Sequence, residues 1–367
     1  MSKKCFIKYD KQNKFVSTFN PENGFYLRSG IIENKEDTGV DPFMASYPEL
    51  LDVGIQGHCK HGQSGLCIQS GVECYQSGLT KHQENMSLDN FKKIVNESKG
   101  KVFQIALGGR GDPDQHENFE EILKYCRDNY IVPNFTSSGL GFNDRIVALC
   151  KEYCGAIAIS EYRSIYTQRA INMLLKAGIT TNVHYVLSNN SIDEAIIRLL
   201  GNDFPEGINA IIFLLHKPVG LGSKNNVLKY NDPKVKEFFN IIDTVKFPFS
   251  IGFDSCNIPG IINLTKNINR VSIDTCEGGR FSAYISSDMI MLPCSFDQDH
   301  KWGYDISNDT IQNAWNSEQF NDFRNCLSNS CIGCVDRESC FGGCPIVPEI
   351  VLCERNQFTF KKIISGK

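Results

Sequence analysis

Residues 49–78 read ELLDVGIQGHCKHGQSGLCIQSGVECYQSG, and this stretch decides the class of fold. Its first seven residues are mostly apolar and predict a β-strand that runs directly into a loop rich in Gly, Ser and Gln. The loop carries Cys59, Cys67 and Cys74. A thiolate is a metal ligand, and ordinary buried cysteines are not expected in so polar a loop. The three thiols therefore indicate a metal site at the end of the strand.

Strand and helix patterns alternate from this loop to about residue 254. Further strands are predicted at residues 101–107, 132–138, 156–160, 180–188 and 209–215, with helical segments between them. Strands joined by helical crossovers form a parallel sheet, and nearly continuous apolar strands fit a sheet that is covered on both faces. We therefore predict an α/β protein with a partial (β/α)6, TIM-like barrel over residues 49–254.

Two other segments flank the predicted barrel. Residues 1–48 predict an N-terminal extension with strand-like pieces, and residues 255–367 predict an irregular, cysteine-rich domain. The cysteines of this second cluster are Cys276, Cys294, Cys331, Cys334, Cys340, Cys344 and Cys353. Clustered thiols in a chain without a secretory signal favour metal binding over disulfides.

The charge pattern limits the classes of partner. The 367 residues include 38 basic and 42 acidic side chains, a net charge of −4, and no long basic block, which argues against nucleic acid. The start of the chain lacks the apolar run of a signal peptide, and no segment approaches the ~20 apolar residues of a membrane span. We expect a cytoplasmic protein that binds neither nucleic acid nor membrane.

The predicted position of the first cysteine loop suggests its chemistry. In a parallel barrel, the loop after a strand lies at the carboxyl ends of the strands, where such folds place their active sites. Three thiolates there can hold three irons of a 4Fe–4S cluster and leave the fourth iron open. The alternative is a structural zinc ion with His58 or His61 as an added ligand, but the wide cysteine spacings do not match paired C-x-x-C knuckles.

From about Leu50 to Cys353 the chain resembles the radical S-adenosylmethionine superfamily, with a wider cysteine loop than the family's C-x3-C-x2-C. The second strand ends in ALGGRGDPD (106–114), which looks like the family's Gly-Gly-Glu-Pro motif. By resemblance, the glycines present backbone groups to the ammonium of S-adenosylmethionine, and the aspartate is its acidic partner. The residues so implied are Gly108, Gly109, Gly111 and Asp112. A simple Gly-rich turn, with a helix starting at Pro113, is the alternative.

Other strand ends match the family more loosely. Ser160 closes the fourth strand, where family members often place a polar residue for the ribose. Asn182 and His184 share one face of the fifth strand, because side chains alternate with period two, and both can face the cofactor inside the barrel. A core histidine bonded to a backbone carbonyl is the alternative for His184. Lys217 follows the sixth strand, near the implied position of the adenine. No catalytic side chain is assigned.

The tail matches a second family feature. CIGCVDRESCFGGC (331–344) is C-x2-C-x5-C-x3-C and resembles the SPASM domain, an auxiliary-cluster module, with Met289 where the module usually has Gly. The resemblance implies an inner cluster held by Cys276, Cys294 and Cys344, and an outer cluster held by Cys331, Cys334, Cys340 and Cys353. The fourth ligand of the inner cluster is Cys256, Cys326 or none, and the spacing favours an open position. A pair of zinc ribbons is the alternative.

These resemblances imply three 4Fe–4S clusters and S-adenosylmethionine as cofactors of a radical oxidoreductase, which cleaves S-adenosylmethionine to a 5′-deoxyadenosyl radical. The implied substrate is a peptide or protein, and the leading reaction is thioether or carbon–carbon cross-linking of a ribosomal peptide. Side-chain dehydrogenation of the anaerobic sulfatase-maturing type and a non-catalytic zinc-binding scaffold are the alternatives. A reductant such as flavodoxin or ferredoxin is implied. Because only about 50 residues precede the first barrel strand, we expect either a separate leader-recognition protein or a substrate without a leader.

Overall fold

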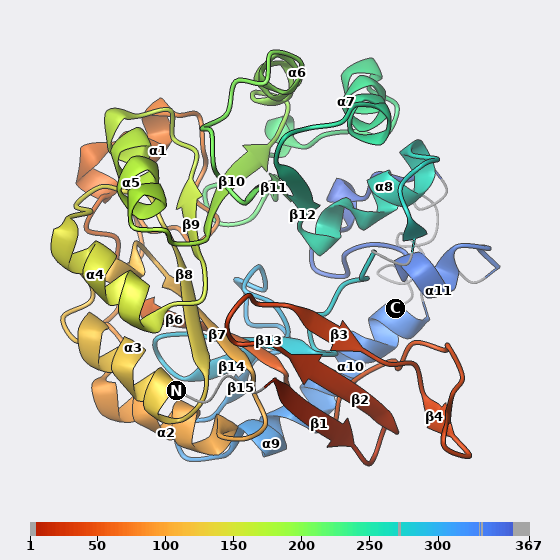
Figure 1. The fold of residues 1–367 in the computed structure, drawn as a ribbon. Helices are drawn as coiled ribbons and strands as arrows, with labels where there is room; N and C mark the ends of the chain where they lie inside the picture. The colour runs from red at the N-terminus through yellow and green to blue at the C-terminus, as the bar shows by residue number, and fades with distance from the viewer. Residues whose placement is uncertain (1–4, 271–272, 330, 332, 355–367) are drawn as a thin grey trace.

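A computed structural model describes residues 5–270, 273–329, 331 and 333–354 of the chain. Its largest sheet has ten strands in the order β12-β11-β10-β9-β8-β7-β6-β13-β14-β15 (Figure 1). The consecutive barrel strands are β6 (Leu50–Gln56), β7 (Gln104–Gly109), β8 (Val132–Ser137), β9 (Ile157–Ser160), β10 (Thr181–Leu187), β11 (Ala210–Leu215) and β12 (Ser250–Phe253). Each is parallel to its neighbours in this set.

Helices connect these strands and cover the outer face of the sheet (Figure 1). They are α2 (Leu88–Ser98), α3 (Phe119–Asp128), α4 (Asp144–Tyr153), α5 (Ile165–Lys176), α6 (Ile192–Leu200) and α7 (Pro233–Thr244), and α8 (Ile258–Leu264) follows β12. Ser87, Asn143 and Ser164 cap α2, α4 and α5 by accepting a hydrogen bond from a first-turn backbone N–H. The predicted partial barrel is confirmed, and β12 adds one more parallel strand. No helix within the described ranges is long and apolar enough to cross a membrane.

The strands present large side chains to the helices and many small ones to the interior. Along β10, Val183, Tyr185 and Leu187 are buried, whereas the alternate residues are partly exposed. Small residues at interior positions of the strands are Gly54, Ala106, Gly108, Ala158, Ala210 and Gly252. A complete TIM barrel fills its interior with bulky branched side chains. This partial barrel instead keeps space for a ligand.

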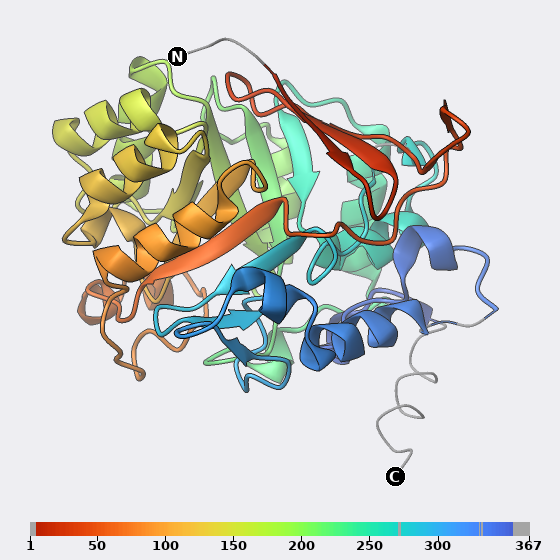
Figure 2. The same ribbon diagram turned by 90° about the horizontal axis from the view of Figure 1, so that it is seen from below.

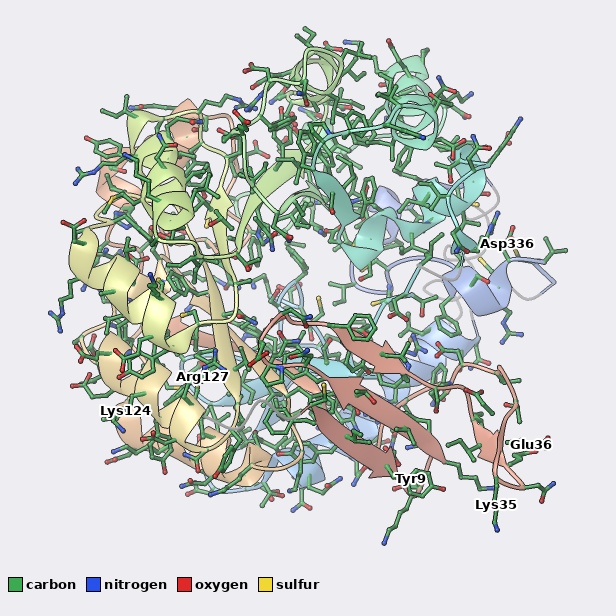
Figure 3. The ribbon with its side chains drawn as sticks, in the orientation of Figure 1. Tyr9, Lys35, Glu36, Lys124, Arg127 and Asp336 are labelled. Carbon is green, nitrogen blue, oxygen red and sulfur yellow. The ribbon has the colours of Figure 1, made fainter. Side chains whose placement is uncertain are left out.

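The described part of residues 1–48 forms two small antiparallel sheets. One contains β1 (Phe6–Asp10), β2 (Phe15–Phe19) and β3 (Tyr26–Arg28), and the other contains β4 (Ile32–Glu33) and β5 (Glu36–Asp37). Phe19 packs on Phe103 and Val132 at the amino ends of β7 and β8, so the first sheet covers the end of the barrel opposite the cysteine loop. In Figure 2 these strands, in red, lie apart from helices α2 to α5. Figure 3 shows Tyr9 pointing from β1 into solvent.

The described C-terminal residues continue the barrel sheet. β13 (Ser282–Ile285) pairs in parallel with β6, and β14 (Ile290–Leu292) and β15 (Tyr304–Asp305) extend the edge in antiparallel fashion. Met289, in the turn between β13 and β14, has a φ of 66°, a conformation that glycine adopts most readily. The helices α9 (Ile311–Trp315), α10 (Glu318–Ser328) and α11 (Arg337–Cys340) follow. The predicted boundary between residues 254 and 255 therefore lies between strands of one sheet.

Arg280 joins the N-terminal segment to the C-terminal one. Its side chain is almost completely buried, and its guanidinium donates hydrogen bonds to the carbonyl oxygens of Phe43 and Cys276 and to the Thr275 hydroxyl. The guanidinium also lies 5.2 Å from the ring centroid of Phe281. One cation therefore satisfies acceptors from two distant parts of the sequence.

We expect Arg280→Met to lower the free energy of unfolding by on the order of 3 kcal/mol, because three buried acceptors lose their donor. Urea denaturation measures the change. Arg145→Met is the control, since Arg145 is exposed on α4 and makes only a surface ion pair with Glu120. Equal unfolding midpoints for Arg280→Met and the wild type would contradict this role.

Candidate functional site

The loop after β6 brings its three cysteines to one place. A side chain at Gly78 would meet Sγ of Cys74 at 3.6 Å and Sγ of Cys59 at 3.9 Å, so these two sulfurs lie close to the same backbone position. The backbone N–H of Gly78 donates to Sγ of Cys74 at 3.3 Å. Cys67, on the short helix α1 (Leu66–Gln69), interacts electrostatically with Cys74. The structure therefore groups the three predicted ligands.

The electrostatics of these thiols fit a site that binds a cation. Burial raises the pKa of Cys59, and the Asp112 carboxylate and the other two thiols raise it further. Burial and the Cys74 thiol likewise raise the pKa of Cys67. Such thiols stay protonated on their own, whereas a bound metal stabilises the thiolates and releases the protons.

The predicted glycine motif lies directly against this loop. Gly109 has a φ of 113°, and a side chain there would come within 2.4 Å of the carbonyl oxygen of Gln56. A side chain at Gly111 would meet the carbonyl oxygen of His58 at 3.1 Å and Cα of Cys59 at 3.2 Å. A side chain at Gly108 would meet nothing within 4 Å, so its backbone faces open space. This motif supports the cysteine loop and leaves one backbone position accessible to a ligand.

Asp112 lies between the glycine motif and the cysteine loop. Its Oδ1 accepts a hydrogen bond from the backbone N–H of Ser138 at 3.0 Å, and its Oδ2 accepts one from the Ser138 hydroxyl. Nε2 of His61 lies 2.9 Å from Oδ2. A carboxylate can accept about four hydrogen bonds, so Asp112 keeps capacity for a further donor. The Asp112 carboxylate is therefore held by Ser138 and His61 and can still accept a hydrogen bond from a ligand.

The three other residues predicted to contact the cofactor occupy different levels of the barrel. Ser160 is the last residue of β9 and is the sheet neighbour of His184 on β10. Nδ1 of His184 lies 3.4 Å from the hydroxyl of Thr136, and burial lowers the pKa of His184 to about 4, which keeps the ring neutral. The side-chain oxygen of Asn182 accepts a hydrogen bond from Asn209, which precedes β11. The structure thus groups Ser160 with His184 and places Asn182 nearer the amino ends of the strands.

Four cysteines line a second site, a cavity of about 730 Å³ between the barrel and the C-terminal segment. They are Cys256, Cys276, Cys294 and Cys344. The hydrogen bond with Cys344 lowers the pKa of the Cys256 thiol, burial opposes this, and Lys217 lowers the pKa further. Cys326 does not line this cavity. The placement favours Cys256 over Cys326 as the fourth ligand and over the open position that the spacing suggested.

Lys217 extends from the end of β11 into the same cavity. Its ammonium forms an ion pair with Asp254 and lies 4.5 Å from the ring centroid of Phe296. Burial lowers the pKa of Lys217, but the Asp254 carboxylate and the Cys256 thiol raise it above its ordinary value. The sequence suggested that the backbone at this position lies near the adenine, and the structure places the Lys217 side chain beside cysteines.

The remaining predicted ligands also lie together. Cys331, Cys334, Cys340 and Cys353 interact electrostatically with one another. Among the residues that the structure describes, no three His, Cys, Asp or Glu side chains are placed to hold one and the same metal ion. A single metal ion needs all its ligands around one point, whereas each cysteine of a cluster binds a different iron. The wider spacing of the cysteines within each set is therefore compatible with a cluster.

Asp52 is a site residue that the sequence analysis missed. It is a sheet neighbour of Ala106 and Tyr284, and it lines the cavity of the four cysteines. Its carboxylate has no hydrogen-bond or ion-pair partner among the described residues, and burial raises its pKa to about 6. The signal that could have found it is the presence of a charged residue within an otherwise apolar, buried strand.

Comparisons with known proteins support the fold. Neither a protein-family model nor a curated protein sequence matches the chain. Among solved structures, Streptococcus suis SuiB bound to precursor peptide SuiA gives a TM-score of 0.67 at 13% identity, over 94% of this chain and 95% of that one. SuiB bound to S-adenosylmethionine gives 0.63 at 15% identity, over 83% and 74%. Native anSMEcpe with bound S-adenosylmethionine and Cp18Cys peptide gives 0.59 at 16% identity, over 83% and 91%. The chain has the fold of these proteins.

We expect Asp52→Asn to stabilise the protein at neutral pH. Between about pH 4 and pH 6 the native carboxyl keeps a proton that the unfolded chain has lost, so the free energy of unfolding falls as pH rises through this window. The variant lacks this penalty and should be more stable at pH 7 by up to about 3 kcal/mol, but not at pH 4. Urea denaturation at both pH values measures the difference. Asp128→Asn is the control, because the Asp128 side chain is half exposed at the end of α3, and its effect should not differ between the two pH values. If Asp52→Asn changes the free energy of unfolding equally at both pH values, the claim is refuted.

Proposed function

We propose that this chain is a radical S-adenosylmethionine enzyme that modifies a peptide or protein. The observation that carries the proposal is the convergence of Cys59, Cys67 and Cys74 beside the open backbone of Gly108. Three thiolates give a 4Fe–4S cluster three ligands and leave one iron for S-adenosylmethionine. The structures that share this fold hold S-adenosylmethionine and peptides, which supports both ligand classes.

The chain's own residues would bind and orient the cofactor. When bound, the cluster supplies the electron that cleaves S-adenosylmethionine to methionine and a 5′-deoxyadenosyl radical, which takes a hydrogen atom from the substrate. Gly108, Gly109 and Gly111 let the cofactor approach the backbone, and Asp112 offers a carboxylate for the methionine ammonium. Ser160 would contact the ribose, and neutral His184, its sheet neighbour, would face the cofactor. The small interior residues leave room for the substrate.

The two other cysteine sets would hold auxiliary clusters, for a total of three 4Fe–4S clusters. The inner set is Cys256, Cys276, Cys294 and Cys344, and the outer set is Cys331, Cys334, Cys340 and Cys353. Because each set then has four thiols, we infer that both carry electrons, without a substrate thiolate as a ligand. A flavodoxin or ferredoxin would exchange electrons with them, and a separate protein would recognise a leader.

A closed inner set bears on the reaction. Thioether formation through a metal-bound substrate thiolate needs an open iron, and in this proposal Cys256, which lines the cavity and interacts with Cys344, would take that position. We therefore propose carbon–carbon cross-linking of a ribosomal peptide, with side-chain dehydrogenation as the second candidate, since both need only outer-sphere electron transfer. A non-catalytic zinc scaffold is separated from both by iron and sulfide analysis.

Anaerobic reconstitution should yield about twelve irons per chain. Replacing Cys59, Cys67 and Cys74 together with Ala should remove about four of them and abolish 5′-deoxyadenosine formation from S-adenosylmethionine under dithionite. Replacing Cys126, Cys150 and Cys154, which lie at α3 and α4, is the matched control and should leave iron content unchanged. Retained cleavage by the first triple variant would overturn the proposed function.

Asp112→Ala should weaken binding of S-adenosylmethionine at least several-fold while iron content stays intact, because a charge-assisted hydrogen bond is lost. Equilibrium dialysis of the reconstituted protein measures the dissociation constant. Ser138→Ala is the control, since it removes one hydrogen bond to Asp112 but keeps the carboxylate. If Asp112→Ala binds S-adenosylmethionine as tightly as Ser138→Ala and the wild type do, Asp112 has only the structural role of holding the loop.

A further inference from the structure

A buried cation faces the inner cysteine set. Lys217 is 5% exposed, and its ammonium interacts electrostatically with the thiols of Cys256 and Cys294 as well as with Asp254. Phe296 covers it from another side. Lys217 follows the end of β11 and so belongs to a different segment from the cysteines.

The ion pair with Asp254 does not by itself explain why an ammonium is buried at this position. Taking an ammonium out of water costs several kcal/mol, and replacing a buried ion pair by apolar residues is often neutral or stabilising. Asp254 also accepts hydrogen bonds from the backbone N–H of Leu215 at 3.2 Å and from the side chain of Asn257 at 2.7 Å. The carboxylate is therefore shared among three donors, and it only partly offsets the ammonium at the cavity wall.

Charges of both signs lie beside the inner cysteine set. Its cavity is lined by the ammonium of Lys217 together with the carboxylates of Asp52, Asp254, Asp274 and Glu277. Lys217 is the one basic residue among the described residues that line the cavity. The carboxylate of Asp112 interacts with Cys59 and Cys67 at the first set, whereas the ammonium of Lys217 interacts with Cys256 and Cys294 at the inner one. Reduction adds a negative charge to a cluster, so a nearby anion opposes it and a nearby cation favours it. Such interactions are strong in a buried site of low dielectric.

We propose that Lys217 is a redox-tuning residue whose fixed positive charge raises the reduction potential of the inner cluster. The inference rests on the proposed function. A higher potential favours the inner cluster as the acceptor of the electron that a substrate radical loses. Lys217 acts through the cluster and does not touch the substrate.

The test is a redox titration of the reconstituted full-length protein, with dithionite as reductant and electron paramagnetic resonance as readout. The inner cluster is identified as the signal lost in Cys276→Ala. Lys217→Met should lower the potential of that signal alone. Asp254→Asn should raise it, and the double variant should lie between the two single ones. Lys217→Arg, which keeps the charge, and Lys234→Met, exposed on α7, should leave it unchanged.

The outcomes separate the inference from the proposed function. Protein that takes up no iron–sulfur clusters would overturn the proposed function. If clusters form and S-adenosylmethionine is cleaved, but the inner potential is the same in Lys217→Met, Asp254→Asn and the wild type, Lys217 has only a structural role. If Lys217→Met does not fold, the opposite shift expected of Asp254→Asn decides the matter. A shift of all signals together in Lys217→Met would also refute a local effect.

Discussion

Backbone-to-backbone contact at glycines is the constraint on which the first site depends. At Gly109 and Gly78 any side chain would collide with the loop that carries the cysteines, at Gln56 in one case and at Cys59 in the other. The loop can therefore lie against the carboxyl end of β7. Parallel strands bring their carboxyl ends to one edge, so Ser160 and His184 lie at the same end of the barrel.

The small interior residues of the barrel and the buried charges of Asp52 and Lys217 act on the same region of the molecule. Glycine and alanine at interior positions leave few bulky side chains inside the barrel, and Asp52 and Lys217 both line the cavity of the four cysteines. A charge in such a space is poorly screened. The two residues thus give the cavity a carboxylate and an ammonium, at positions fixed by β6 and by the end of β11. A substrate between the two cysteine sites would lie near both.

Much of the fold followed from periodicity. Apolar strands and amphipathic helices alternate so regularly between residues 49 and 254 that a parallel sheet was the natural prediction, and the strands appear where the sequence indicated them. The addition of β13 beside β6 was not predictable, because that pairing joins segments more than two hundred residues apart and leaves no local pattern. Met289 shows the same limit: its positive φ is a property of the turn between two paired strands.

The sequence by itself determined the thiols, their grouping into sets and the strand after which the first set follows, because ligand type and local periodicity are written in consecutive residues. Only the tertiary structure brings Cys256, and not Cys326, to the cavity that Cys276, Cys294 and Cys344 line, through the packing of α8 and the C-terminal segment. It also sets the surroundings of Asp52 and Lys217, whose neighbours come from distant segments. Burial and electrostatic environment are set by those distant neighbours, and no local pattern records them.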